Sequence, residues 1–329
     1  MSQLTAKEVI NHYLTLASQD RVPEGLAYLS EHAQHQRSQA LLKKLNKRFD
    51  LQQLEKPDPK LPPLVRAVLS AYAHYLPYAL LKLGNGLWQK QLLLIQLSQI
   101  KGLEPALSCS FDALDTHDSL DEAIENIEIL IQLALSKIGY SFLGGLTLPY
   151  YGPYLYGREE PVKYEIELPC GIQSVQVVFM HDFLMRGWLD FATLGQVGTG
   201  GWAKIEALYC VSQNWDRDSD DFKIRYLKHE AQHLSDYQRF PQIAQGHQSI
   251  LEYRAKLAEL VYAKNLEHFY LILRDANRES LAPHAQAASD ILKGFEAHSQ
   301  PYALSDIAEV NAIARGLLEA SDLELMKDI

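Results

Sequence analysis

Apolar residues recur at helical spacing through the first part of the chain, most clearly between Asp121 and Gly139. Five of them fall three or four positions apart and form one apolar stripe: Ile124, Ile127, Ile131, Leu135 and Ile138. Three more widen the stripe: Ile129, Leu130 and Leu133. This pattern predicts a helix that is buried on more than one side. We expect residues 5–140 to be helical, with a stiff connector at the proline-rich segment 56–63.

Beyond Gly139 the pattern changes from helical periodicity to short strand-like runs. Residues 140–156 mix glycine and proline with six Tyr or Phe residues, which predicts a loop or an aromatic packing surface. Four strand-like runs follow, separated by turn residues: Lys163–Leu168, Ser174–Met180, Gly187–Leu194 and Trp202–Val211. An Asp-rich turn, in which Asp220 or Asp221 can cap a helix, then begins a helical region that continues to the C-terminus.

These patterns predict an α+β fold that is mainly α. We expect a helical N-terminal region at residues 1–145 and a second domain at residues 146–329. The second domain would hold a small sheet at about 163–211 and helices at about 219–329.

Composition narrows the possible classes of protein. The 329 residues carry a formal charge of −10, and this acidic balance argues against nucleic acid as the main partner. The three cysteines, Cys109, Cys170 and Cys210, are too few and too scattered for a disulfide framework. We find no apolar signal core at the N-terminus and no unbroken apolar run of about 20 residues, so we expect a soluble cytoplasmic protein without a membrane segment. The oligomeric state is not predicted.

The chemically informative stretch is an HExxH motif, His229-Glu230-Ala-Gln-His233. About 0.03 such matches are expected by chance in a chain of this composition. Two histidines four apart lie on one face of a helix, where both imidazoles can bind one Zn²⁺. Glu230 lies beside them, close enough to take a proton from water. Pro241 ends the helix at or before Phe240.

A zinc site needs at least three protein ligands, and Glu252 is the candidate for the third. Eighteen residues separate it from His233, and a turn followed by a helix from Ser249 to about Ala276 could return it to the histidines. Alternatively, Ser249 and Glu252 form a helix-capping box, in which Glu252 binds only the backbone. Glu259, two turns further along, and Asp236 are rival ligands.

On these residues the chain resembles the gluzincin class of zinc metallopeptidases, over about residues 187–276. In that class HExxH is followed by a glutamate ligand on the next helix, and the 18-residue gap equals that of its aminopeptidase branch. The resemblance implies that His229, His233 and Glu252 hold Zn²⁺ and that Glu230 is the general base. It also implies a mixed sheet before the motif helix, with an edge strand that binds the substrate backbone. Residues Gly200, Gly201 and Trp202 are the candidates for that strand.

The chain departs from this class in two places. The GxMEN-type motif that binds a free amino end is missing from the segment 198–202. Some gluzincins carry an acidic residue four positions after the glutamate ligand, where this chain has Lys256, so Asp236 is the candidate to orient an imidazole. No spacing singles out an oxyanion donor among Tyr253, Tyr262, His268, Tyr270, His284 and His298.

The favoured function is therefore a zinc-dependent hydrolase, a peptidase acting on a peptide or protein. The competing class is a non-catalytic helical interaction protein, in which the HExxH is accidental or holds a structural metal. A structural zinc has four protein ligands, so a fourth ligand such as Asp236 would favour that alternative. Hydrolysis of a substrate other than a peptide is a third possibility, because the ligands do not fix the substrate.

Overall fold

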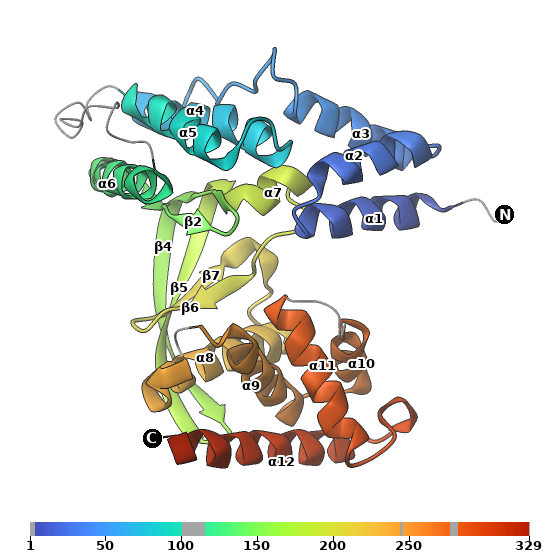
Figure 1. Cartoon of the computed structure of the whole chain (residues 1–329). Coiled ribbons are helices and arrows are strands. Elements are labelled where there is room, and N and C mark those ends of the chain that lie inside the picture. Colours follow the sequence, from blue (N-terminus) through green and yellow to red (C-terminus); the bar gives the residue numbers. More distant parts are fainter. Residues whose placement is uncertain (1–3, 101–115, 244–245, 277–281, 329) are drawn as a thin grey trace. The chain divides into compact units, whose positions relative to one another are not determined.

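A computed structural model describes residues 4–100, 116–243, 246–276 and 282–328, so Cys109 lies outside the described residues. The described chain is α+β and mainly α, as predicted (Figure 1). It divides into two compact units: the first comprises Met1–Arg158 and His181–Gly198, and the second comprises Glu159–Met180 and Thr199–Ile329. No helix in the described ranges is long and apolar enough to cross a membrane.

The first unit is built mainly of helices, as the periodicity predicts. These helices are α1 (Ala6–Ser18), α2 (Val22–His32), α3 (Gln36–Arg48), α4 (Pro63–Leu80), α5 (Gly86–Ser98) and α6 (His117–Ser136). No helix forms between Arg48 and Pro63, which confirms the proline-rich connector.

Helix α6 confirms the predicted apolar stripe but not its predicted width. Ile124, Ile131 and Leu135 are fully buried, whereas the side chains of Ile129 and Leu133 are more than half exposed. The prediction of burial on more than one side is therefore wrong for Ile129 and Leu133, whereas Leu130 is partly buried and packs against the core. Ile138 lies beyond the end of α6 and is exposed, so the buried stripe ends at Leu135.

The sheet begins earlier in the chain than predicted. Its strands are β1 (Ser141–Leu143), β4 (Tyr154–Leu168), β5 (Gly171–Arg186), β6 (Gly201–Ala203) and β7 (Leu208–Val211), in the order β1-β4-β5-β7-β6. A separate antiparallel pair is formed by β2 (Leu146–Thr147) and β3 (Tyr150–Tyr151). Residues 140–156 are thus largely strand rather than loop. Strand β7 runs parallel to β5 and antiparallel to β6, so the sheet is mixed.

Two strand predictions need correction. Gly187–Leu194 is not a strand: helix α7 covers Gly187–Thr193, because Trp188, Phe191 and Ala192 have helical spacing and are buried together. The run Trp202–Val211 is not one strand but the hairpin of β6 and β7, closed by a hydrogen bond from the Lys204 N–H to the Ala207 carbonyl.

The long hairpin of β4 and β5 explains why the division of the chain differs from the boundary expected near residue 145. Both strands cross from one unit to the other, and α7 then returns to the first unit. There Trp188, Phe191 and Ala192 join the core built by α1 to α6. One boundary in the sequence cannot describe a chain that leaves a unit and re-enters it.

The second unit continues from the sheet into helices. They are the π-helix Phe222–Lys228, α8 (His229–Arg239), α9 (Gln248–Val261), α10 (Leu266–Arg274), α11 (Pro283–Glu296) and α12 (Ile307–Leu325). The helix predicted from Ser249 to Ala276 is broken between Val261 and Leu266, where the Asn265 side chain caps α10. Asp221 precedes the π-helix without a side-chain cap, and the Ser219 hydroxyl accepts the Phe222 N–H instead.

Candidate metal centre

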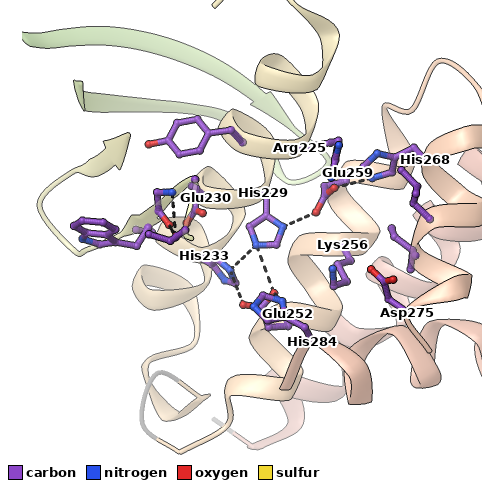
Figure 2. A pocket seen from close by; sticks show the side chains of 18 of the residues that line it. Arg225, His229, Glu230, His233, Glu252, Lys256, Glu259, His268, Asp275 and His284 are labelled. Atoms are coloured by element: carbon purple, nitrogen blue, oxygen red, sulfur yellow. Dashed lines mark hydrogen bonds and ion pairs between the residues drawn. The ribbon is translucent and has the colours of Figure 1, made fainter. Parts of the chain in front are cut away.

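A cleft of about 460 Å³ in the second unit contains the HExxH motif. Strand β6, the π-helix and helices α8, α9, α10 and α11 all contribute to its lining. Figure 2 shows its labelled residues: His229 lies at the centre, with His233 and Glu252 on one side and Glu259 with His268 on the other.

Helix α8 presents the two motif histidines rigidly because its inner face is packed. Phe222, Tyr226 and Leu227 of the preceding π-helix join Ala231 and Leu234 in one core cluster with the sheet. His229 and His233 are both buried, at 8% and 7% exposed. Their Nε2 atoms point at each other, 3.1 Å apart.

Glu252 reaches these histidines from α9. Its Oε2 lies 3.5 Å from Nε2 of His229, and its Oε1 lies 3.6 Å from Nε2 of His233. Helix α9 begins at Gln248 with His247 as its N-cap, so the capping-box role for Ser249 and Glu252 is wrong.

The separations of the three ligand atoms suit a zinc ion. With metal–ligand bonds of about 2.0–2.1 Å, neighbouring ligands of a tetrahedral Zn²⁺ lie roughly 3.3 Å apart, because a tetrahedron's edge is about 1.63 times its centre-to-vertex distance. The observed separations of 3.1, 3.5 and 3.6 Å bracket that value. Among the described residues, His229, His233 and Glu252 form the one cluster of this kind that could hold a metal.

Glu259, a rival ligand in the sequence, orients His229 instead. Its Oε1 lies 2.5 Å from Nδ1 of His229, and its Oε2 lies 2.6 Å from Nε2 of His268 on α10. Burial alone would raise the pKa of the Glu259 carboxyl, but the two imidazoles hold that pKa below its ordinary value. A carboxylate there accepts the Nδ1–H of His229 and leaves the Nε2 lone pair free for a metal.

The role predicted for Asp236, orienting an imidazole, is wrong. Its carboxylate is fully buried and accepts hydrogen bonds from Nε and Nη2 of Arg254 and from the Gln232 amide. Nδ1 of His233 has no hydrogen-bond partner among the described residues. Asp236 therefore belongs to a buried ion-pair network rather than to the histidine cluster, and it does not serve as a fourth ligand.

His284, in the first turn of α11, contacts Glu252 from the other side. Its Nδ1 lies 2.8 Å from Oε2 of Glu252. Burial would raise the pKa of the Glu252 carboxyl, but His233, His284 and His229 together hold that pKa far below its ordinary value. Glu252 is therefore ionised, which is the form that binds a cation.

Strand β6 forms the opposite lining of the cleft and is the edge strand of the sheet. The Gly200 carbonyl accepts bonds from the Val211 N–H and the Trp215 indole N–H, so it is already occupied. Along an antiparallel pair of strands, residues that hydrogen-bond to the partner strand alternate with residues whose backbone groups point away from it. In this register Trp202 bonds to β7, whereas Gly201 and Ala203 direct their backbone groups outward.

The outward groups of Gly201 are bonded to the Thr199 hydroxyl, so those of Ala203 remain for a ligand. Of the three residues expected in the substrate-binding edge strand, Gly201 and Trp202 lie in β6 and Gly200 precedes it; substrate binding there stays a prediction. Ala203 carries no sequence signal of its own and could be found only from the strand register.

Glu230 lines the same cleft and is partly exposed. In Figure 2 it lies on the side of His229 away from Glu259 and His268. It can therefore face a water or substrate in the cleft without competing with Glu259 for His229.

Sequence spacing alone does not reveal the residues that surround the three proposed ligands. These residues are Glu259, His268 and His284. A weak sequence signal exists for Glu259, which follows Glu252 by two helical turns and so shares its face. His268 and His284 lie on separate helices beyond turns, where no spacing rule applies.

Comparison with protein-family models, with curated proteins and with solved structures gave no match to this chain. The site must therefore be interpreted from its own geometry.

Proposed function

We propose that this chain is a zinc-dependent peptidase with Glu230 as its general base. The observation that carries the proposal is the convergence of His229, His233 and Glu252 at tetrahedral spacing inside an open cleft. A site with three protein ligands leaves one position for a water or a substrate, as catalytic zinc sites do.

The chain's own residues would divide the work as follows. His229, His233 and Glu252 hold the ion, and Glu259 fixes the ring of His229 through its Nδ1–H. Bound zinc supplies Lewis acidity, which lowers the pKa of water to about 7 and polarises a carbonyl group. The Glu230 carboxylate takes a proton from the attacking water and delivers it to the leaving nitrogen.

A peptide is the favoured substrate because strand β6 forms a sheet edge along the cleft. An extended chain can add to such an edge through main-chain hydrogen bonds. The proposal is supported by Ala203, which lines the cleft and directs its N–H and C=O away from β7.

The structural-metal alternative would need a fourth protein ligand. Asp236 is bonded to Arg254, and the nearest further histidine, His284, contacts Glu252 and is 67% exposed. These contacts favour a catalytic metal site over a closed structural one. Hydrolysis of a substrate other than a peptide is the second candidate function, because the metal ligands do not determine the substrate.

The first test is metal content of protein purified without added metal. We expect about one zinc per chain in the wild type and a strong loss in Glu252→Ala, with Glu319→Ala on the exposed face of α12 as the matched control. Absence of zinc in the wild type, even after zinc addition and dialysis, would refute the proposal.

The second test separates metal binding from catalysis. Glu230→Gln should retain zinc and lose about 10²–10⁴-fold in kcat on a peptide library, because it removes a general base but no ligand. Wild-type zinc content without any cleavage of the library would instead favour the non-catalytic alternative.

A further inference from the structure

Lys256 places a positive charge in the cleft beside the proposed metal ligands. It lies on α9 one turn after Glu252 and just under one turn before Glu259, and all three side chains line the cleft. Figure 2 shows Lys256 between the ligand cluster and Asp275.

The two neighbouring glutamates do not form ion pairs with this lysine. Their spacing from Lys256 suits ion pairs along a helix, yet both carboxylates are held by histidines: Glu252 by His284, and Glu259 by His229 and His268. Lys256 makes no hydrogen bond or ion pair with any described residue, although it is partly buried.

A second cation, Arg225 of the π-helix, lines the same cleft. Its ion pair with Asp221 is long, at 3.5 Å, and is solvent-exposed. The acidic residue on this side of the cleft, Asp275, is already paired with Arg274 at 3.2 Å. Lys256 thus forms no ion pair with a described carboxylate, and Arg225 forms only the exposed pair with Asp221, so both cations can pair with an anion that enters the cleft.

We propose that Lys256, assisted by Arg225, binds a carboxylate of the substrate, so that the cleft selects peptides with a negative charge close to the scissile bond. This inference rests on the proposed function, because it names the substrate class of the same site. An Asp or Glu side chain and a peptide C-terminus can each supply this carboxylate, and the chemistry of recognition is the same for both.

Cleavage of matched peptides tests this selectivity. One set of acetylated, amidated peptides carries a Glu scanned through every position, the second carries Gln instead, and a third is a neutral set with free C-termini. We expect zinc-loaded wild type to prefer at least one carboxylate-bearing set by about tenfold in kcat/KM over its neutral counterpart. The preference should fall to about one in Lys256→Met and persist in Lys256→Arg.

Lys293→Met serves as the control, because Lys293 lies on the exposed side of α11 and pairs with Asp290. It should keep the wild-type preference. Which set is preferred, the Glu set or the free C-termini, identifies the source of the carboxylate. Equal kcat/KM for all sets, or a preference unchanged in Lys256→Met, overturns the inference.

Binding measured without cleavage separates this inference from the proposed function. Zinc-loaded Glu230→Gln protein is titrated with the same peptides by calorimetry. If carboxylate peptides bind more tightly than the neutral peptides, and if this difference depends on Lys256, the anion site is supported. This holds even if the wild type cleaves nothing, and then only the peptidase proposal fails. The anion site is refuted if the affinity is equal for Glu and Gln peptides and also equal for free and amidated C-termini. This outcome counts against the anion site even if the wild type is an active peptidase.

Discussion

Individual residues decide whether the histidine cluster can hold a metal, and Glu259 has the most consequential position. It bridges His229 of α8 and His268 of α10, so it fixes both the ring orientation and the tautomer of a proposed ligand. His229 is therefore preorganised by a residue that does not itself face the metal position.

Replacing Glu259 with Gln should weaken zinc binding by about 10–100-fold, because the imidazole loses its charged acceptor. A competition titration against a chromophoric chelator measures this change. Glu319→Gln is the control and should bind zinc as the wild type does. An unchanged zinc affinity in Glu259→Gln would show that packing alone orients His229.

The residues that the sequence identified are those that obey a local spacing rule. His229, Glu230 and His233 are candidates because of the helix repeat, and Glu252 is a candidate because its 18-residue gap equals that of the class that the chain resembles. Asp236 lies on the expected helical face, but Arg254, 18 residues away, competes for its carboxylate. Pairing between distant residues depends on tertiary packing, which no local spacing specifies.

At the scale of elements, β6 approaches its neighbours closely enough to require glycine. A Cβ on Gly201 would lie 2.2 Å from the Tyr209 carbonyl oxygen and 2.4 Å from the Tyr226 ring. Gly201 therefore allows the edge strand and the π-helix to pack together beside the cleft.

Gly201→Ala should destabilise the protein by about 1–3 kcal/mol through overpacking. Urea unfolding measures the loss, and Gly198→Ala is the matched control because a Cβ there meets nothing within 4 Å. Equal stability of the two variants would contradict the close approach.

Helices α8, α9 and α12 are joined by the buried guanidinium of Arg254. It bonds to Asp236 of α8 and to Asp322 and Ser321 of α12, and its side chain is fully buried. Burial lowers the pKa of Arg254, but its two aspartates more than offset this and keep it charged.

Arg254→Met should cost about 3–5 kcal/mol of unfolding free energy, because it leaves Asp236 buried without its charge partner. The double variant Arg254→Met with Asp236→Asn should recover part of that loss. Chemical denaturation of both variants measures the difference, and a double variant no more stable than the single one would show that lost packing, not charge, is responsible.

Sequence periodicity gave reliable element types where one face is buried, as in α6 and α8. It failed at Gly187–Leu194, where a short apolar run fits either a strand or a helix and tertiary contacts decide. It also failed at the turn of β6 and β7, because residues 204–207 contain no Gly, Pro, Asn or Asp to mark a reversal.

For the molecule as a whole, a buried carboxyl in the first unit links stability to pH. Glu128 of α6 is 5% exposed and accepts hydrogen bonds from the Tyr72 hydroxyl and the Gly145 N–H. Burial raises the pKa of Glu128 from 4.5 to about 7, although these two hydrogen bonds oppose the shift. The folded state therefore retains this proton to higher pH than the unfolded chain does.

Because the folded-state pKa is raised, the stabilisation is full below about pH 4.5 and is lost as pH rises through about 7. Compared with Glu128→Gln, the wild type should lose about 3 kcal/mol of unfolding free energy between pH 4.5 and 8. Urea titrations of both proteins across this range measure the difference. Parallel pH profiles would show that Glu128 ionises with no energetic cost.

The shortness of β6 also bears on self-association. Long open strand edges act as templates on which further chains add, which leads to aggregation. Gly201 directs its outward backbone groups to the Thr199 hydroxyl, and only the single residue Ala203 of the strand is left to pair. Such an edge can hold one residue of a guest chain in register, yet it is too short to nucleate a growing sheet between copies of the protein.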